Sequence, residues 1–182
     1  MGIPNLLTFL RIILIPVFIL LFYLPFRGSH VLAAIIFIFA AMTDWLDGYL
    51  ARSLGQVSKL GTFLDPVADK LIVVTALVLL VGDRVLPYLA IPASVIICRE
   101  IMVSALREWM AEIGKRTRIA VTRIGKIKTT VQMLALILLL LYKPGAWFAL
   151  ALSGYLLLYL AALLTLWSMS LYLKAAWHDL SS

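Results

Sequence analysis

The chain has 182 residues, of which 64% are hydrophobic, and its mean hydropathy is +1.06. This composition excludes a water-soluble globular domain and is typical of a helical membrane protein. Sixteen Lys and Arg residues against nine Asp and Glu residues give a net charge of +7. The single cysteine, Cys98, excludes an internal disulfide and indicates nothing about the redox compartment.

Long apolar segments separated by short polar breaks predict an all-α integral membrane protein with six transmembrane helices. We expect one membrane-embedded domain over residues 1–182. No cleavage site of small residues follows the first segment, which therefore reads as a retained span and not as a signal peptide. In chain order, the predicted spans cover about 4–26, 31–51, 63–82, 86–108, 124–142 and 146–173.

Basic residues are distributed unevenly between the two ends of these spans. The three tight turns at one end contain only Arg27, Arg84 and Lys143. The other thirteen of the sixteen basic residues belong to the opposite end, so the positive-inside rule places that end in the cytoplasm. Both termini and the acidic residues at 44–69 then face the cytoplasm. Orientation and contact with anionic lipids explain the charge without nucleic acid.

Four of the nine acidic residues lie within residues 44–69. Asp44 and Asp47 are three residues apart, and Asp65 and Asp69 are four apart. Both spacings place the two side chains on one face of a helix. Carboxylates held close together repel one another unless they are protonated or neutralised, and oxygen ligands suit Mg²⁺ or Mn²⁺. Four can hold two ions, which stabilise the attacking and leaving oxygens in phosphoryl transfer.

Small residues stand beside these aspartates. Gly48, Ala51 and Gly61 leave room for a flat ligand against the backbone, and Arg52 is placed to bind a phosphate oxygen. Two other interpretations remain open. The aspartates could be interfacial charges paired with cations such as Lys70, or they could form an ion relay in a transporter. Their position at the cytoplasmic end, and the lack of a broken-helix repeat, argue against a transporter.

The pattern Asp-x2-Asp-Gly-x2-Ala-Arg-x8-Gly-x3-Asp-x3-Asp resembles the signature of the CDP-alcohol phosphatidyltransferase family, and every position is filled. The resemblance implies metal-dependent transfer of a phosphatidyl group from a CDP-linked lipid to an alcohol. It implies that the four aspartates hold the metals and that Asp69 also deprotonates the acceptor hydroxyl. The small residues and Arg52 would shape the cytidine diphosphate pocket. A homodimer is implied by the resemblance alone.

A group of basic residues follows the aspartates. Arg99 and Arg107 are eight residues apart and roughly on one helix face, and Arg118, Arg123, Lys126 and Lys128 follow them. An acceptor that carries its own phosphate needs such a basic pocket beside the metals. We expect Arg99, which has isoleucine neighbours, to face the protein interior. Simple pairing with Glu100 or Glu108 is the alternative for Arg99, and a lipid-facing polybasic loop that includes Lys115 and Arg116 is the alternative for the group.

Flanking stretches at 4–11, 99–109 and 125–129 are similar to the bacterial branch of this family that makes phosphatidylglycerophosphate. The resemblance implies that the basic pocket binds sn-glycerol 3-phosphate and that the lipid donor is CDP-diacylglycerol. It also places Asn5 and Thr8 near the nucleotide, although both residues equally suit a helix start. The nearest alternative keeps the chemistry but uses inositol phosphate or phosphatidylglycerol as the acceptor.

Overall fold

The computed structural model describes the backbone of residues 3–26, 28–54, 59–83, 85–113, 123–143 and 148–180. Side chains in these ranges are described except at 3–5, 44, 45, 47–54, 59, 60, 62, 63, 123–126, 172 and 174–180. This part of the chain contains six α-helices and no β-strand, which confirms the predicted all-α fold. The helices are α1 (Ile3–Tyr23), α2 (Ser29–Leu54), α3 (Lys59–Gly82), α4 (Ala90–Glu112), α5 (Arg123–Leu141) and α6 (Phe148–Leu180).

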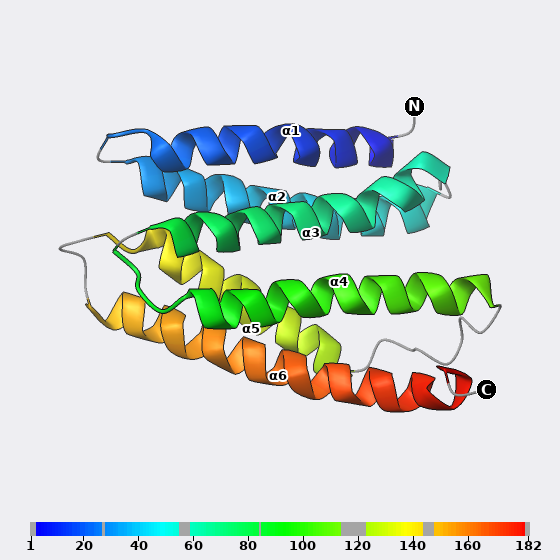
Figure 1. Ribbon diagram of the computed structural model, residues 1–182. Helices are drawn as coiled ribbons and strands as arrows, with labels where there is room; N and C mark the ends of the chain where they lie inside the picture. Colours follow the sequence, from blue (N-terminus) through cyan, green and yellow to red (C-terminus); the bar gives the residue numbers. More distant parts are fainter. Residues whose placement is uncertain are drawn as a thin grey trace.

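The helices run up and down as an antiparallel bundle (Figure 1). Helix α1 packs against α2 and α3, and α6 packs against α5 and α4. Contacts of α5 with α2 and α3 join these two groups. The start of α1 and the end of α6 lie at the same end of the bundle (Figure 1), as an even number of antiparallel helices requires.

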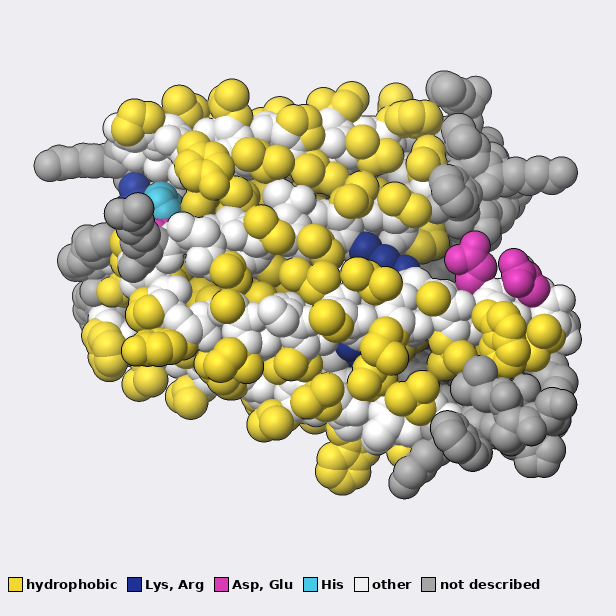
Figure 2. Space-filling view, viewed as in Figure 1, with side chains coloured by type: hydrophobic (Ala, Val, Ile, Leu, Met, Phe, Trp, Pro, Cys, Tyr) yellow, Lys and Arg dark blue, Asp and Glu magenta, His cyan; other side chains and the backbone are white. Residues whose placement is uncertain are grey.

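The lateral surface of the bundle suits a membrane. The helices are 19 to 33 residues long, so at about 1.5 Å per residue even the shortest is about as long as a bilayer's hydrocarbon core is thick. Hydrophobic side chains cover most of the face seen in Figure 2. Large apolar residues such as Ile13, Leu20, Ile91 and Leu163 are each at least 60% exposed. Apolar surface on this scale indicates contact with lipid.

Charged residues distinguish the helices from one another. Leu6–Tyr23 and Phe148–Leu171 are long and apolar enough, by length and composition alone, to cross a membrane. Shorter apolar segments cover Ser29–Thr43 and Ile127–Leu141. Helices α3 and α4 carry several ionisable residues, which lower their hydropathy below that of a simple span. Asp69, Lys70, Glu100 and Arg107 line the candidate site described below, whereas Glu108 and Glu112 of α4 are exposed outside it.

The end of the bundle opposite the termini is tied together by hydrogen bonds. Tyr155 Oη donates to the carbonyl of Pro87 at 2.6 Å, and Tyr159 Oη donates to the carbonyl of Tyr88 at 3.0 Å. Tyr88 has a φ of 64°, in the left-handed region that a helix cannot include. Helix α4 therefore begins at Ala90, a few residues later than predicted.

The interior is closely packed. Phe18 of α1 and Phe37 of α2 are fully buried, with ring centroids 6.0 Å apart. Gly154 of α6 faces Leu139 of α5 so closely that a Cβ added at Gly154 would lie 2.8 Å from the leucine side chain. Only a glycine fits at this point of the α5–α6 contact without displacing its neighbour.

Candidate active site

A cavity of about 770 Å³ lies between α2, α3, α4 and α5, with Arg11 of α1 also at its wall. Its polar lining side chains are Arg11, Asp69, Lys70, Glu100, Arg107, Thr129, Thr130 and Gln132. Along α3 the side chains that line the cavity change from charged, at Asp69, to apolar, at Leu77, about 12 Å further along the helix. Met42 also lines the cavity and is 65% exposed, so the cavity opens on the hydrophobic surface of the bundle. One cavity thus joins an ionic compartment to an apolar one.

The predicted aspartates are described in part. Asp65 and Asp69 lie one turn apart on α3, and both side chains are partly exposed. Asp69 lines the cavity. Helix α2 includes Asp44 and Asp47, but their side chains are outside the described residues. Among the described side chains, no group of three His, Cys, Asp or Glu forms a metal site.

Helix α1 supplies a hydrogen-bond donor to each described aspartate. Thr8 is buried and its Oγ1 donates to Asp65 Oδ1. Arg11 has no exposed surface and its Nη1 forms an ion pair with Asp69 Oδ1. A buried cation beside a carboxylate favours the ionised carboxylate and fixes its orientation. The contact of Thr8 is therefore with a predicted metal ligand, whereas the sequence placed Thr8 near the nucleotide.

Arg11 is the site residue that the sequence analysis missed. It was counted only as one of the basic residues at the cytoplasmic end. Two signals were available. An ionisable residue inside an apolar span is a functional candidate by default, and the three-residue spacing of Thr8 and Arg11 places both on one face of α1. The sequence could not show which residue Arg11 meets, because its partner is 58 positions away.

Lys70 follows Asp69 on α3 but bonds elsewhere. Its Nζ donates to Ser104 Oγ of α4, and Ser104 Oγ in turn donates to the backbone carbonyl of Glu100 at 2.6 Å. Among the described contacts, Lys70 therefore connects α3 to α4 and is not the neutralising partner of the aspartates that one interpretation of the sequence suggested.

A cross-helix ionic network lies on the other side of the cavity. Glu100 Oε1 accepts from Arg99 Nη1 at 2.7 Å and from Lys128 Nζ of α5 at 2.9 Å. Arg99 Nη2 also reaches Ser168 Oγ of α6 at 3.4 Å. Arg99 and Lys128 are both buried, as expected for Arg99 from its isoleucine neighbours. The pairing of Arg99 with Glu100, raised from sequence as an alternative, is present.

The other predicted basic residues differ in what the structure describes. Arg107 lines the cavity and is largely exposed. Lys126 lies in the first turn of α5, but its side chain is not described, and Arg118 is outside the described residues altogether. Arg107 and Glu100 of α4 thus line the same cavity as Asp69 of α3.

Of the residues predicted to lie near the nucleotide, only Thr8, discussed above, and Gly61 are described beyond the backbone. This glycine is buried near the start of α3, one turn before Asp65. Gly48, Ala51 and Arg52 lie in the last part of α2, and Asn5 lies in the first turn of α1, but their side chains are outside the described residues.

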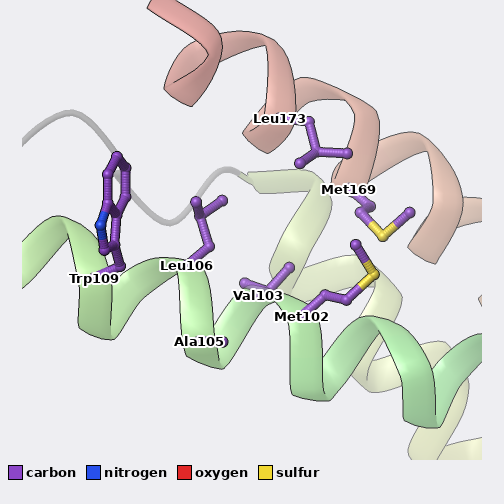
Figure 3. Close-up of a pocket in the computed structure, with 7 residues that line it drawn as sticks. All are labelled: Met102, Val103, Ala105, Leu106, Trp109, Met169 and Leu173. Carbon is purple, nitrogen blue, oxygen red and sulfur yellow. The ribbon is translucent and has the colours of Figure 1, made fainter. Parts of the chain in front are cut away.

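Two further cavities lie away from the aspartates. A cavity of about 400 Å³ between α4 and α6 is lined by apolar side chains, including Met102, Trp109 and Met169, and by no ionisable one (Figure 3). Another, of about 700 Å³ at the opposite end of the bundle, includes His30, whose ring lies 5.0 Å from that of Phe22. The second is also lined by Asp83 and Lys143, but neither cavity is lined by an aspartate of the signature. The 770 Å³ cavity is lined by Asp69 of that signature and is therefore the candidate active site.

Comparison with known proteins agrees with the signature. A sequence model of the CDP-alcohol phosphatidyltransferase family matches residues 1–167. The chain belongs to this family, as the aspartate pattern predicted, and the family is membrane-embedded.

Three relatives, each named CDP-diacylglycerol–glycerol-3-phosphate 3-phosphatidyltransferase, match almost the whole chain. The protein of Yersinia enterocolitica is 53% identical over 180 residues, covering 99% of this chain and 97% of the relative. That of Pseudomonas fluorescens is 57% identical over 189 residues, covering 100% and 93%. That of Pectobacterium atrosepticum is 54% identical over 179 residues, covering 98% and 97%.

Proposed function

We propose that this protein transfers the phosphatidyl group of CDP-diacylglycerol to the 1-hydroxyl of sn-glycerol 3-phosphate, giving phosphatidylglycerophosphate and CMP. The observation that carries this function is the identity of 53% to 57% with full-length relatives named for that reaction. The cavity supports it, because acidic and basic side chains meet there beside an apolar lining that suits a lipid chain.

The reaction exchanges one phosphorus–oxygen bond for another. The acceptor's 1-hydroxyl oxygen bonds to the lipid-linked phosphorus, the bond from that phosphorus to the bridging oxygen breaks, and CMP leaves with the electron pair. Asp69 accepts the hydroxyl proton as a general base. Arg11, paired with Asp69, holds the carboxylate in place, and Thr8 does the same for Asp65. Direct attack is favoured over a covalent intermediate, since His30 lines the cavity at the opposite end of the bundle, away from the aspartates.

Two Mg²⁺ or Mn²⁺ ions complete the site in this proposal, held by Asp44, Asp47, Asp65 and Asp69. The donor set fits, because carboxylates that project from one face of α3 offer the hard oxygen ligands these ions prefer. When bound, the ions offset the charge of the diphosphate and stabilise the CMP leaving group. Gly48, Ala51, Arg52 and Gly61, with Asn5, would form the adjoining nucleotide pocket.

The basic side of the cavity would hold the acceptor's phosphate. Arg107 lines the cavity directly, and Arg99 lies buried behind it on the same helix. Arg118 and Lys126 would complete this pocket. A phosphate monoester matches such a cluster, since guanidinium groups bind its oxygens through charge-assisted hydrogen bonds.

The membrane setting follows from the charge distribution. We infer that the protein is a multi-pass protein of a bacterial inner membrane, with the active site and both termini in the cytoplasm. The start of α1 and the end of α6 share one end of the bundle, which supports this orientation (Figure 1). A homodimer stays a prediction of the family resemblance.

The decisive experiment uses the purified protein in lipid–detergent micelles with CDP-diacylglycerol and Mn²⁺. CMP release with sn-glycerol 3-phosphate, and its loss on chelation with EDTA, are the expected results. No CMP with this acceptor, but release with inositol phosphate or phosphatidylglycerol, would assign a different acceptor. Cation flux across liposomes without CMP formation would instead identify a transporter.

A further inference from the structure

Glu100 is an acidic residue at the centre of a predicted anion-binding pocket. It lines the cavity, and a single oxygen, Oε1, accepts hydrogen bonds from Arg99 Nη1 at 2.7 Å and Lys128 Nζ at 2.9 Å. A carboxylate repels a phosphate, so its presence here needs a reason. The two hydrogen bonds supply one, because they join cations from two different helices.

The same turn of α4 also gathers a third cation. Lys70 of α3 donates to Ser104, which lies one turn after Glu100 and donates to its backbone carbonyl. Cations from α3, α4 and α5 thus converge on residues 100–104. Arg99 and Lys128 are buried and do not themselves line the cavity, but the carboxylate that both contact, that of Glu100, does, and so does Gln132, one turn after Lys128.

Charge and geometry both suit a phosphate. Arg99 and Lys128 contribute two positive charges against the one negative charge of Glu100, so the trio keeps a net charge of +1. Both cations are buried, and without a carboxylate between them they would repel at low dielectric. From the two bond lengths, Arg99 Nη1 and Lys128 Nζ are at most 5.6 Å apart. Donors at such spacing can bind separate oxygens of one phosphate.

We propose that Glu100 is the positioning residue of the acceptor-phosphate pocket, and that it holds Lys128 beside Arg99 so that both cations can bind the phosphate. This inference rests on the proposed function. Glu100 fixes the two cations in advance, and the phosphate of the acceptor supplies the negative charge that the trio lacks. Binding therefore requires little reorganisation of these side chains.

The test measures CMP release while either sn-glycerol 3-phosphate or CDP-diacylglycerol is varied. Glu100→Gln and Lys128→Met should each raise the KM for sn-glycerol 3-phosphate about 10- to 100-fold, with kcat and the KM for CDP-diacylglycerol changed less than about threefold. The double variant should resemble the single variants, because residues that act as one unit are not additive. Glu100→Asp, which keeps the carboxylate, should recover part of the acceptor affinity.

Glu112→Gln is the matched control, since Glu112 is an exposed glutamate at the end of the same helix, and its kinetics should equal those of the wild type. An unchanged acceptor KM in Glu100→Gln or Lys128→Met would overturn the inference, as would an equal loss in all kinetic parameters. If Glu100→Gln does not fold, Lys128→Met decides. Wild-type protein that releases no CMP with this acceptor would instead refute the proposed function.

Discussion

The acidic and basic sides of the cavity each contain a buried ion pair, but we propose that they bind ligands of opposite charge. The acidic side comprises α1 and α3 with Thr8, Arg11, Asp65 and Asp69, and the basic side comprises α4 and α5 with Arg99, Glu100, Arg107 and Lys128. Each side has a buried cation paired with a carboxylate on another helix. In each, the ion pair fixes side chains that would otherwise be costly inside a membrane protein.

The two sides differ in what each ion pair leaves over. On the acidic side Arg11 is paired with Asp69, and Asp65 is a second described carboxylate, whereas on the basic side Arg99 and Lys128 share the single carboxylate of Glu100. The acidic side therefore attracts cations, and the basic side attracts an anion. The excess of carboxylates on one side and of cations on the other, more than the presence of an ion pair, separates the two proposed roles. Substitutions on the acidic side should lower kcat, and those on the basic side should raise the acceptor KM.

The largest effect is expected from Asp69→Asn on the acidic side. Loss of the general base should lower kcat about 10²- to 10⁴-fold, since proton transfer contributes a factor of this size. The KM for sn-glycerol 3-phosphate should change little. CMP release measures both parameters, and Asp83→Asn, at the opposite end of the bundle, is the control. An Asp69→Asn protein with near-normal turnover would exclude the base assignment.

Arg11→Met should have the next largest effect. The substitution keeps much of the side-chain volume but removes the charge that orients Asp69, so kcat should fall about 10- to 100-fold. Replacing a residue that hydrogen-bonds a metal ligand typically lowers activity by such a factor. When Mn²⁺ is titrated in the CMP-release assay, half-maximal activity should require a higher Mn²⁺ concentration than in the wild type. If only the acceptor KM responds, the division between the two sides is wrong.

Arg107→Ala tests the basic side. Removal of a guanidinium that lines the cavity should raise the KM for sn-glycerol 3-phosphate about tenfold, with kcat changed only a few-fold. Initial rates at varied acceptor concentration provide the measurement. Lys143→Ala, at the opposite end, should leave the KM unchanged. A fall in kcat without a change in KM would assign Arg107 to the chemical step.

The smallest effect on activity is expected from Gly154→Ala. The added methyl meets Leu139, which is fully buried, and should destabilise the α5–α6 contact by about 1–3 kcal/mol. Thermal unfolding in detergent measures the loss. Gly82→Ala is the matched control, because a Cβ there meets nothing within 4 Å. Because α5 carries Lys128 and α6 carries Ser168, which both contact the basic side, the acceptor KM should rise less than about threefold while kcat changes less.

Local patterns account for what the sequence could predict. Apolar segments and turns predicted the all-α fold, and the spacing of Asp65 and Asp69 predicted their common position one turn apart on a helix. The family followed from the same short pattern, because its residues are close in the chain.

The ion pairs between helices of the site could not be predicted from the sequence, because they join residues that are far apart in the chain. The residues next to Arg11 in the sequence do not indicate that it pairs with Asp69, and those next to Glu100 do not indicate that it pairs with Lys128. Helix packing alone brings each pair together. Tyr88 illustrates the same limit for element ends. Two tyrosines of α6 hydrogen-bond the loop that holds it, and this tertiary contact accompanies the late start of α4.

The opening of the cavity beside Met42 has a consequence for how the enzyme is measured. The lipid substrate can slide in from the bilayer with its acyl chains still among neighbouring lipids, and its product can leave in the same way. The relevant donor concentration is then a mole fraction in the plane of the membrane. At a fixed bulk amount of CDP-diacylglycerol, dilution with inert lipid or detergent should slow the reaction, whereas dilution with buffer should affect only the capture of the water-soluble acceptor.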